Sequence, residues 1–147
     1  MRVVLQRVKS ASVSVHGNVS GAIGAGLLVF AAIHDNDSSQ DIEYIADKII
    51  NMRIFADDNG RFARSLREVD GSLLVVSQFT LYADCSKGNR QSFINAAKPV
   101  HAKKIYTEFV NYMYNQNLVI KTGIFGKMMQ VSLVNDGPVT IILDTKI

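Results

Sequence analysis

The stretch that decides the fold is residues 131–142, V-S-L-V-N-D-G-P-V-T-I-I. Two apolar runs flank four turn-forming residues, Asn135, Asp136, Gly137 and Pro138. In these runs, and on to residue 143, apolar side chains recur at every second position, which predicts two β-strands with one buried face. The four residues between the runs predict a change in the course of the backbone.

The Gly137-Pro138 step is unusual beside a strand, because proline has no N–H for the ladder and glycine has no side chain to pack. One interpretation is a hairpin or a turn at a strand edge. The other is that bare backbone is presented to a ligand or a partner, with the X-Pro bond in the cis form that proline permits. The spacing alone does not decide between them.

Length and composition predict one soluble globular domain over residues 1–147. Of the 147 residues, 48% are hydrophobic and 20% are charged, which is typical of a folded domain large enough for a core. No apolar tract is long enough to span a membrane, and Gln6-Arg7 interrupts the apolar start too early for a signal peptide. We therefore expect a cytoplasmic protein with no membrane partner.

The sequence carries no metal, cofactor or nucleophile motif. Cys85 is the only cysteine, which excludes an internal disulfide, and His16, His34 and His101 are too far apart for ligand spacing. Glycine fingerprints, P-loops and nucleophile elbows are also missing. We expect neither a metal nor a cofactor. The net charge of +3 is compatible with a nucleic-acid partner but is weak support for one.

The rest of the chain predicts a mixed α/β fold. A capping-box pattern at Ser38 and Asp41 opens one helix, Pro99 suits the first turn of a second, and each helix has one apolar stripe. A turn at residues 17–18 predicts a hairpin. Apolar runs predict strands at residues 2–9, 11–16, 19–23, 27–33, 73–76, 119–124, 128–134 and 139–143.

Residues 72–82, S-L-L-V-V-S-Q-F-T-L-Y, form the second informative stretch. Its buried strand ends in the polar residues Ser77, Gln78 and Thr80, which need partners. They are either polar groups satisfied at a strand end or the floor of a pocket, placed where α/β sheets bind ligands. Such a pocket has no strong base, so it would depend on a catalytic group from the substrate.

These motifs together resemble a known family. S-Q-F-T-L at residues 77–81 and N-D-G-P-V-T at residues 135–140 are similar, in this order, to motifs of the D-aminoacyl-tRNA deacylases, first called D-tyrosyl-tRNA deacylases. The resemblance implies a single domain of two packed, barrel-like β layers with two main helices on one side. It runs nearly end to end and also covers Q-R-V at 6–8, G-A-G-L-L-V at 24–29, R-I-F at 53–55 and L-V-V at 74–76.

The resemblance implies hydrolysis of the ester that joins a D-amino acid to the terminal ribose of tRNA. Glycyl-tRNA mischarged on an alanine tRNA is a further implied substrate. The implied partners are the aminoacylated 3′ end of tRNA and a second copy of the chain in a cytoplasmic homodimer. An L-amino acid is rejected because its side chain meets the carbonyls of a Gly-cis-Pro unit, whereas a D side chain points away.

The resemblance also assigns roles to residues. Gly137-Pro138 enters the pocket of the partner subunit, and Arg7 fixes its orientation. Thr80 is either a nucleophile or a positioning group beside the 2′-hydroxyl of the tRNA, and the second fits better with a site that lacks a base. The implied substrate contacts are Phe79, Arg7 and Met129. The implied catalytic set comprises Ser77, Gln78, Thr80, Gly137 and Pro138.

Two loops depart from the family pattern. Gln91 stands where proline is usual, and Phe62-Ala63 replaces a common Met-Asn pair. A nucleic-acid binder without chemistry is the competing class, and it leaves the polar strand end and the Gly-Pro step unexplained. A related type of deacylase with a trans Gly-Pro bond is disfavoured by Ser77-Gln78.

Overall fold

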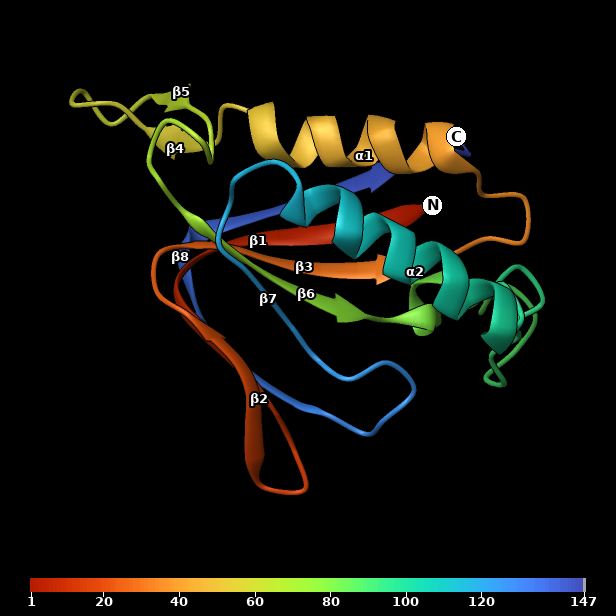
Figure 1. The fold of residues 1–147 in the computed structure, drawn as a ribbon. Helices are drawn as coiled ribbons and strands as arrows, with labels where there is room; N and C mark the ends of the chain where they lie inside the picture. The colour runs from red at the N-terminus through yellow and green to blue at the C-terminus, as the bar shows by residue number, and fades with distance from the viewer. Residues whose placement is uncertain (147) are drawn as a thin grey trace.

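The computed structural model describes residues 1–146 and contains one strongly curved six-stranded sheet with two helices on one side (Figure 1). The strand order is β2-β1-β3-β6-β7, with β8 paired to β1, while β4 and β5 form a separate ribbon. No helix in these residues is long and apolar enough to cross a membrane. The elements are β1 (Arg2–Val15), β2 (Asn18–Ile23), β3 (Gly26–Ala32), α1 (Ser39–Asn51), β4 (Phe55–Ala56), β5 (Phe62–Arg64), β6 (Ser72–Ser77), the 3-10 helix η1 (Phe79–Tyr82), α2 (Pro99–Tyr114), β7 (Ile120–Thr122) and β8 (Gln130–Asp144).

This architecture confirms the predicted mixed α/β class with a barrel-like sheet. The two β layers are parts of one sheet that folds over itself, as the curve from β3 to β2 shows in Figure 1. The sheet nearly closes where β2 approaches β7. At this point the Ser20 hydroxyl donates a hydrogen bond of 3.3 Å to the Thr122 carbonyl.

The sheet is built around β1, whose 14 residues pair along both edges. Residues 2–8 pair with β3 on one edge, residues 11–15 pair with β2, and β8 follows the other edge. The prediction of two separate N-terminal strands is wrong, because a register shift at Lys9 lets one strand continue. The hairpin turn falls at His16 and Gly17, which have φ of 50° and 79°, one residue earlier than predicted.

The course of β8 overturns the hairpin interpretation of the Gly-Pro step. β8 is one strand that pairs antiparallel with β1 on both sides of that step. Gln6 pairs with Thr140 and Val8 with Asn135, so a step of two on β1 matches a step of five on β8. The excess of three residues leaves the ladder as a bulge. The chain therefore bulges outward here and does not reverse.

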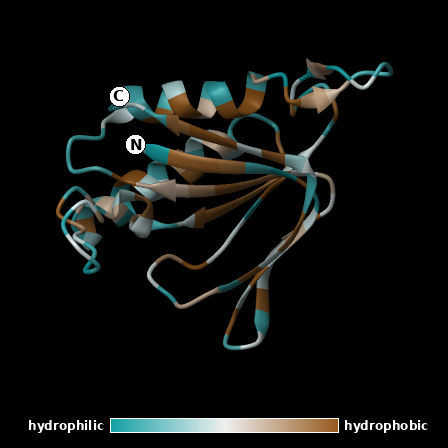
Figure 2. Ribbon diagram, turned by 180° about the vertical axis from the view of Figure 1, so that it is seen from behind, coloured by the Kyte–Doolittle hydropathy of each residue, from teal (hydrophilic) through white to brown (hydrophobic). Residues whose placement is uncertain are grey.

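Two apolar clusters lie on opposite faces of the sheet. Leu27 belongs to the cluster under α1 and α2, and its neighbour Leu28 belongs to the cluster inside the curve of the sheet. On β8, Ile141 packs against the first cluster and Val131 against the second. The prediction of one buried face for both arms of β8 is wrong, because an odd number of extra residues exchanges the two faces. Figure 2 shows the hydrophobic residues concentrated along the central strands.

The parallel pair β3 and β6 places the polar end of residues 72–82 at an edge of the sheet. Ala31 pairs with Ser77, so both strands end at the same level. The close approach at their start requires glycine, because Gly26 has a φ of 158° and a Cβ there would overlap the Ser72 carbonyl. After Ser77 the chain turns into η1, which brings the following residues to the same edge.

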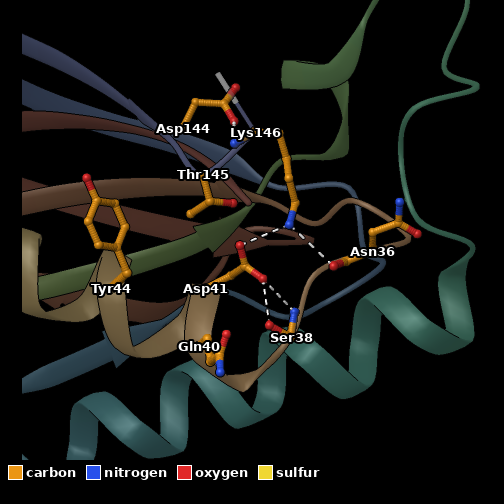
Figure 3. Close-up of a pocket in the computed structure, with 8 residues that line it drawn as sticks. All are labelled: Asn36, Ser38, Gln40, Asp41, Tyr44, Asp144, Thr145 and Lys146. Atoms are coloured by element: carbon orange, nitrogen blue, oxygen red, sulfur yellow. Dashed lines mark hydrogen bonds and ion pairs between the residues drawn. The ribbon is translucent and has the colours of Figure 1, made fainter.

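Both helices begin with the predicted signals. Pro99 occupies the first turn of α2. At the start of α1, the Asp41 carboxylate accepts hydrogen bonds from the backbone N–H (2.9 Å) and hydroxyl (2.8 Å) of Ser38. Figure 3 shows that Lys146 also donates to this carboxylate, at 3.0 Å. Burial raises the pKa of Asp41, but hydrogen bonds from Ser38, Thr145 and Lys146 outweigh it and hold that pKa well below its usual range.

Replacing Asp41→Asn should lower the free energy of unfolding at pH 7 by about 1 kcal/mol, because the charged cap of α1 is lost. A lowered folded-state pKa means that the carboxylate stabilises the fold above its unfolded-state pKa, and that this contribution is lost as the pH falls through the folded-state pKa. Urea unfolding should therefore show a gap between wild type and variant that narrows below about pH 4. The exposed Glu43→Gln on the same helix is the control, and a gap independent of pH would contradict the prediction.

Candidate active site

A pocket of about 820 Å³ opens at the ends of β3 and β6. Its walls are mainly apolar, and its polar edge consists of side chains that follow the end of β6. Ser77 and Gln78 are half-buried, whereas Phe79 and Thr80 are exposed to the pocket opening. Met129 reaches the same pocket from the segment before β8. The fold thus brings together five of the predicted site residues.

Gln78 fixes the hydroxyl of Thr80. The amide Nε2 of Gln78 donates to Thr80 Oγ1 at 2.5 Å, and the backbone N–H of Gln78 donates to the Ala31 carbonyl at 2.8 Å. Among the described residues, the pocket lining includes no Asp, Glu, His or Cys. The described lining therefore offers Thr80 no carboxylate, imidazole or thiolate that could accept its proton. The arrangement can orient and polarise a bound group.

Phe79 and Phe93 form an aromatic wall of the pocket. Their rings meet edge to face with centroids 5.1 Å apart, and Phe79 is 56% exposed. Two accessible rings offer an apolar surface to a ligand. Phe93 comes from the loop that departs from the family pattern at Gln91, so the sequence analysis did not assign it to the site.

Arg2 supports η1 from behind. Its Nη1 donates to the Leu81 carbonyl at 3.0 Å, its Nε donates to Asp144 at 2.6 Å, and its guanidinium carbon lies 4.9 Å from the centre of the Tyr82 ring. Burial raises the pKa of Asp144, but hydrogen bonds from Lys146 and Arg2 hold that pKa below its usual value. Sequence reasoning missed Arg2, because a second residue in a strand gives no sign that it contacts a segment 79 positions away.

Arg7 organises a second group of residues around the Gly-Pro step. Its Nε donates to the Asp136 carbonyl at 2.8 Å, and its Nη1 donates to the Ile54 carbonyl at 2.6 Å. Its guanidinium carbon lies 5.3 Å from the centre of the Phe62 ring, close enough for a cation–π contact. These contacts explain how a charged side chain lies on an apolar side of β1. They also fix the residue that precedes Gly137.

Asn135 holds the same loop from its other side, although the sequence analysis gave it no role. Its Oδ1 accepts from the Val139 N–H at 2.7 Å, and its Nδ2 donates to the Val139 carbonyl at 3.2 Å. Gly137 has a φ of 149°, and a Cβ there would lie 2.7 Å from a methyl group of Val139. The Gly137–Pro138 bond is cis, and both residues are exposed.

The pocket and the Gly-Pro group do not meet within one chain. Arg7 pairs with Leu27 and Ser77 pairs with Ala31, so the two groups lie four positions apart along β3. This spacing corresponds to about 13 Å along a strand. Arg7, Gly137 and Pro138 are accordingly missing from the pocket lining. Arg7 thus lies level with the start of β3, whereas Ser77 lies level with its end.

Known proteins with similar sequences and structures identify the family. The family model described as D-Tyr-tRNA(Tyr) deacylase matches residues 4–144. Proteins named D-aminoacyl-tRNA deacylase from Thermosipho africanus (strain TCF52B) and Desulfatibacillum aliphaticivorans are each 56% identical over 146 residues. These matches cover 99% of this chain and 98% and 100% of those proteins.

Two solved structures are similar along nearly the whole chain. One, titled "c-Myc DNA Unwinding Element Binding Protein", has a TM-score of 0.95 and 38% identity and covers 100% of both chains. The other is described as a probable eukaryotic D-amino acid tRNA deacylase; with a TM-score of 0.83, 17% identity and 97% of both chains covered, it shows the shared fold alone. The family match over residues 4–144 and the relatives at 56% identity show that this chain belongs to the D-Tyr-tRNA(Tyr) deacylase family.

Proposed function

We propose that this protein hydrolyses the ester bond between a D-amino acid and the terminal ribose of tRNA, in the cytoplasm. The observation that carries the proposal is the pocket, whose polar edge of Ser77, Gln78 and Thr80 lies against mainly apolar walls without a carboxylate, imidazole or thiol among the described residues. Such a site suits a substrate that brings its own catalytic hydroxyl. The name of the relatives, D-aminoacyl-tRNA deacylase, supports the same substrate class.

The proposed mechanism uses the 2′-hydroxyl of the terminal ribose to position a water molecule. The water oxygen bonds to the ester carbon, the bond from that carbon to the ribose 3′-oxygen breaks, and a proton from the water ends on the 3′-oxygen. Thr80 serves as a positioning residue, because its oxygen accepts a hydrogen bond from Gln78 and no neighbouring base takes its proton. Rate acceleration then comes from orientation and fixed dipoles.

In this proposal a second copy of the chain completes the site. Within the described residues β8 pairs only with β1, so its other edge is free. Leu133, Val134 and Ile142 of this strand are 36%, 52% and 65% exposed. A long free edge with apolar side chains favours coverage by another chain. A two-fold dimer would allow Gly137-Pro138 of one chain to reach the pocket of the other, which it does not reach in its own.

Chiral selection follows from this composite site. Carbonyls of the Gly137-Pro138 loop would stand against the Cα of the amino acid, where hydrogen fits and a side chain does not. A D side chain points away from that wall, and glycine has none, so glycyl-tRNA is a further proposed substrate. Arg7 and Asn135 suit the loop to this task, because they fix its backbone at Asp136 and Val139.

The protein should release D-amino acids from D-aminoacyl-tRNA without added metal and act far more slowly on the L-enantiomers. The slow reaction of the L-enantiomers follows from steric exclusion at the substrate Cα. Activity without added metal is expected because residues 1–146 contain no cluster of metal-ligating side chains. Acid-precipitation assays with matched D- and L-tyrosyl-tRNA measure the ratio. Equal rates, or complete loss of activity with a chelator, would contradict the proposal.

Thr80→Ala should retain measurable activity, whereas tRNA ending in 2′-deoxyadenosine should be a poor substrate, because the ribose hydroxyl and not Thr80 positions the water. Single-turnover rates of both proteins on both substrates distinguish the two roles. An inactive Thr80→Ala enzyme, together with normal cleavage of the deoxy substrate by wild type, would instead make Thr80 the nucleophile.

Gly137→Ala should lose activity, D/L discrimination or both while remaining folded. The added Cβ would crowd Val139 and approach Arg7 Nη2 to 3.3 Å, so the loop must change its course. The exposed Gly17→Ala, also at positive φ but with nothing within 4 Å of its Cβ, is the matched control for backbone strain. If the Gly137→Ala enzyme remained active and selective, the loop would not belong to the active site.

Mixing two inactive variants tests whether the site is shared between chains. In a heterodimer of Gly137→Ala and Gln78→Ala, the intact pocket of the first faces the intact loop of the second. Unfolding and refolding the two together should restore up to about a quarter of wild-type activity, since half the dimers are mixed and each has one complete site. Each variant refolded alone is the control, and a mixture with no recovered activity would mean that pocket and loop act in separate sites.

A further inference from the structure

We propose that Lys98 and Lys127 form a cationic rim that binds the phosphates of the RNA segment next to the hydrolysed ester. This inference rests on the proposed function and names the part of the substrate that the pocket does not enclose. The two lysines are the only charged residues among those that line the pocket within residues 1–146. Both are exposed, so their ammonium groups have access to solvent at the pocket opening.

The two lysines come from segments that are far apart in the sequence. Lys98 immediately precedes α2, and Lys127 lies in the loop between β7 and β8. Figure 1 shows the start of α2 past the end of β6 and this loop below β6, and residues of both segments line the pocket. An RNA chain that leaves the pocket between the two lysines would pass two positive charges. The positive end of the 16-residue helix α2 adds to the potential on one side.

Hydrogen bonds of the main chain fix the backbone position of each lysine. The backbone N–H of Lys98 donates to the Asp35 carboxylate at 3.2 Å. Lys127 follows Gly126, which has a φ of 76°, and its N–H donates to the Ile124 carbonyl at 3.2 Å. The Asp35 carboxylate engages the main chain of Lys98, and no ion pair among residues 1–146 occupies its ammonium group.

Neither lysine has a partner of opposite charge in the described chain. The ion pairs formed among residues 1–146 involve the N-terminus, Arg2, Arg7, Arg64 and Lys146. An aminoacyl ester at the end of a tRNA is followed within one nucleotide by a phosphodiester, and lysine binds phosphate as a point charge. Two unpaired cations at the opening therefore match the phosphates that follow in the substrate, whereas the pocket itself holds the aminoacyl end.

The test separates RNA binding from ester hydrolysis. Fluorescence anisotropy measures the binding of a deacylated RNA minihelix that carries the tRNA 3′ end. The measurement is made at several salt concentrations for wild type, Lys98→Gln, Lys127→Gln and the double variant. Each substitution should weaken binding about tenfold at 50 mM salt, and the double variant should lower the salt slope by about 1.4, as expected for two contacts to single-stranded phosphates. The control is Lys48→Gln, an exposed lysine on α1 beside Tyr44 and outside the pocket lining, which should change neither quantity.

The second part of the test measures hydrolysis. The double variant should cleave D-aminoacyl-tRNA with a raised KM and an unchanged kcat, and it should cleave the phosphate-free ester 3′-O-D-tyrosyl-adenosine at the wild-type rate. Unchanged minihelix binding and salt slope in the double variant would overturn the inference, and so would an equal loss on the two esters. If wild type cleaves neither ester, the proposed function fails, and the binding arm still decides the role of the lysines.

Discussion

The pairing of β1 along both of its edges is the constraint on which the rest of the structure depends. β3 and β2 share one edge, so the residues on either side of the Gly-Pro step have only β1 to pair with, through its other edge. β8 must stay in that ladder over its whole length, and its extra residues are forced out as a bulge. Arg7 and Asn135 then supply hydrogen bonds that the ladder no longer provides. An exposed piece of main chain is thereby held in one orientation.

The ion pairs formed among residues 1–146 include no residue of the pocket lining. The pairs Arg2–Asp144 and Lys146–Asp41 stabilise the junction of β1, β8 and α1, and Arg7 pairs with Asp136 beside the Gly-Pro step. At the pocket edge the polar groups are hydroxyls and an amide, which are neutral across the physiological pH range. Their contribution is a set of fixed dipoles, whose strength depends on position and not on the protonation of a partner.

Features with a local signal were predictable from the sequence, and features that depend on distant partners were not. The capping box at Ser38 and the polar end of the buried strand at Ser77 each follow from residues within a few positions, and the structure has both. The continuity of β1 and β8 was missed, because alternation fixes a strand's faces but not the strand it pairs with. Asn135 and Phe93 were missed because their roles depend on where a bulge and a loop lie in the folded chain. The resemblance to a family pointed to Arg7, but only the topology shows how far it lies from Ser77.

The odd number of extra residues in β8 makes the length of this segment harder to vary than its composition. A deletion of one residue between Asn135 and Thr140 would shift one arm by one position relative to β1. Because side chains alternate with a period of two, the shift would exchange the inward and outward residues of that arm. Ile141 and Leu143 would leave the cluster beneath the helices, or Val131 would leave the inner cluster. Natural variation in this loop should therefore be dominated by substitutions, and a change in length should preserve both faces only when it adds or removes two residues.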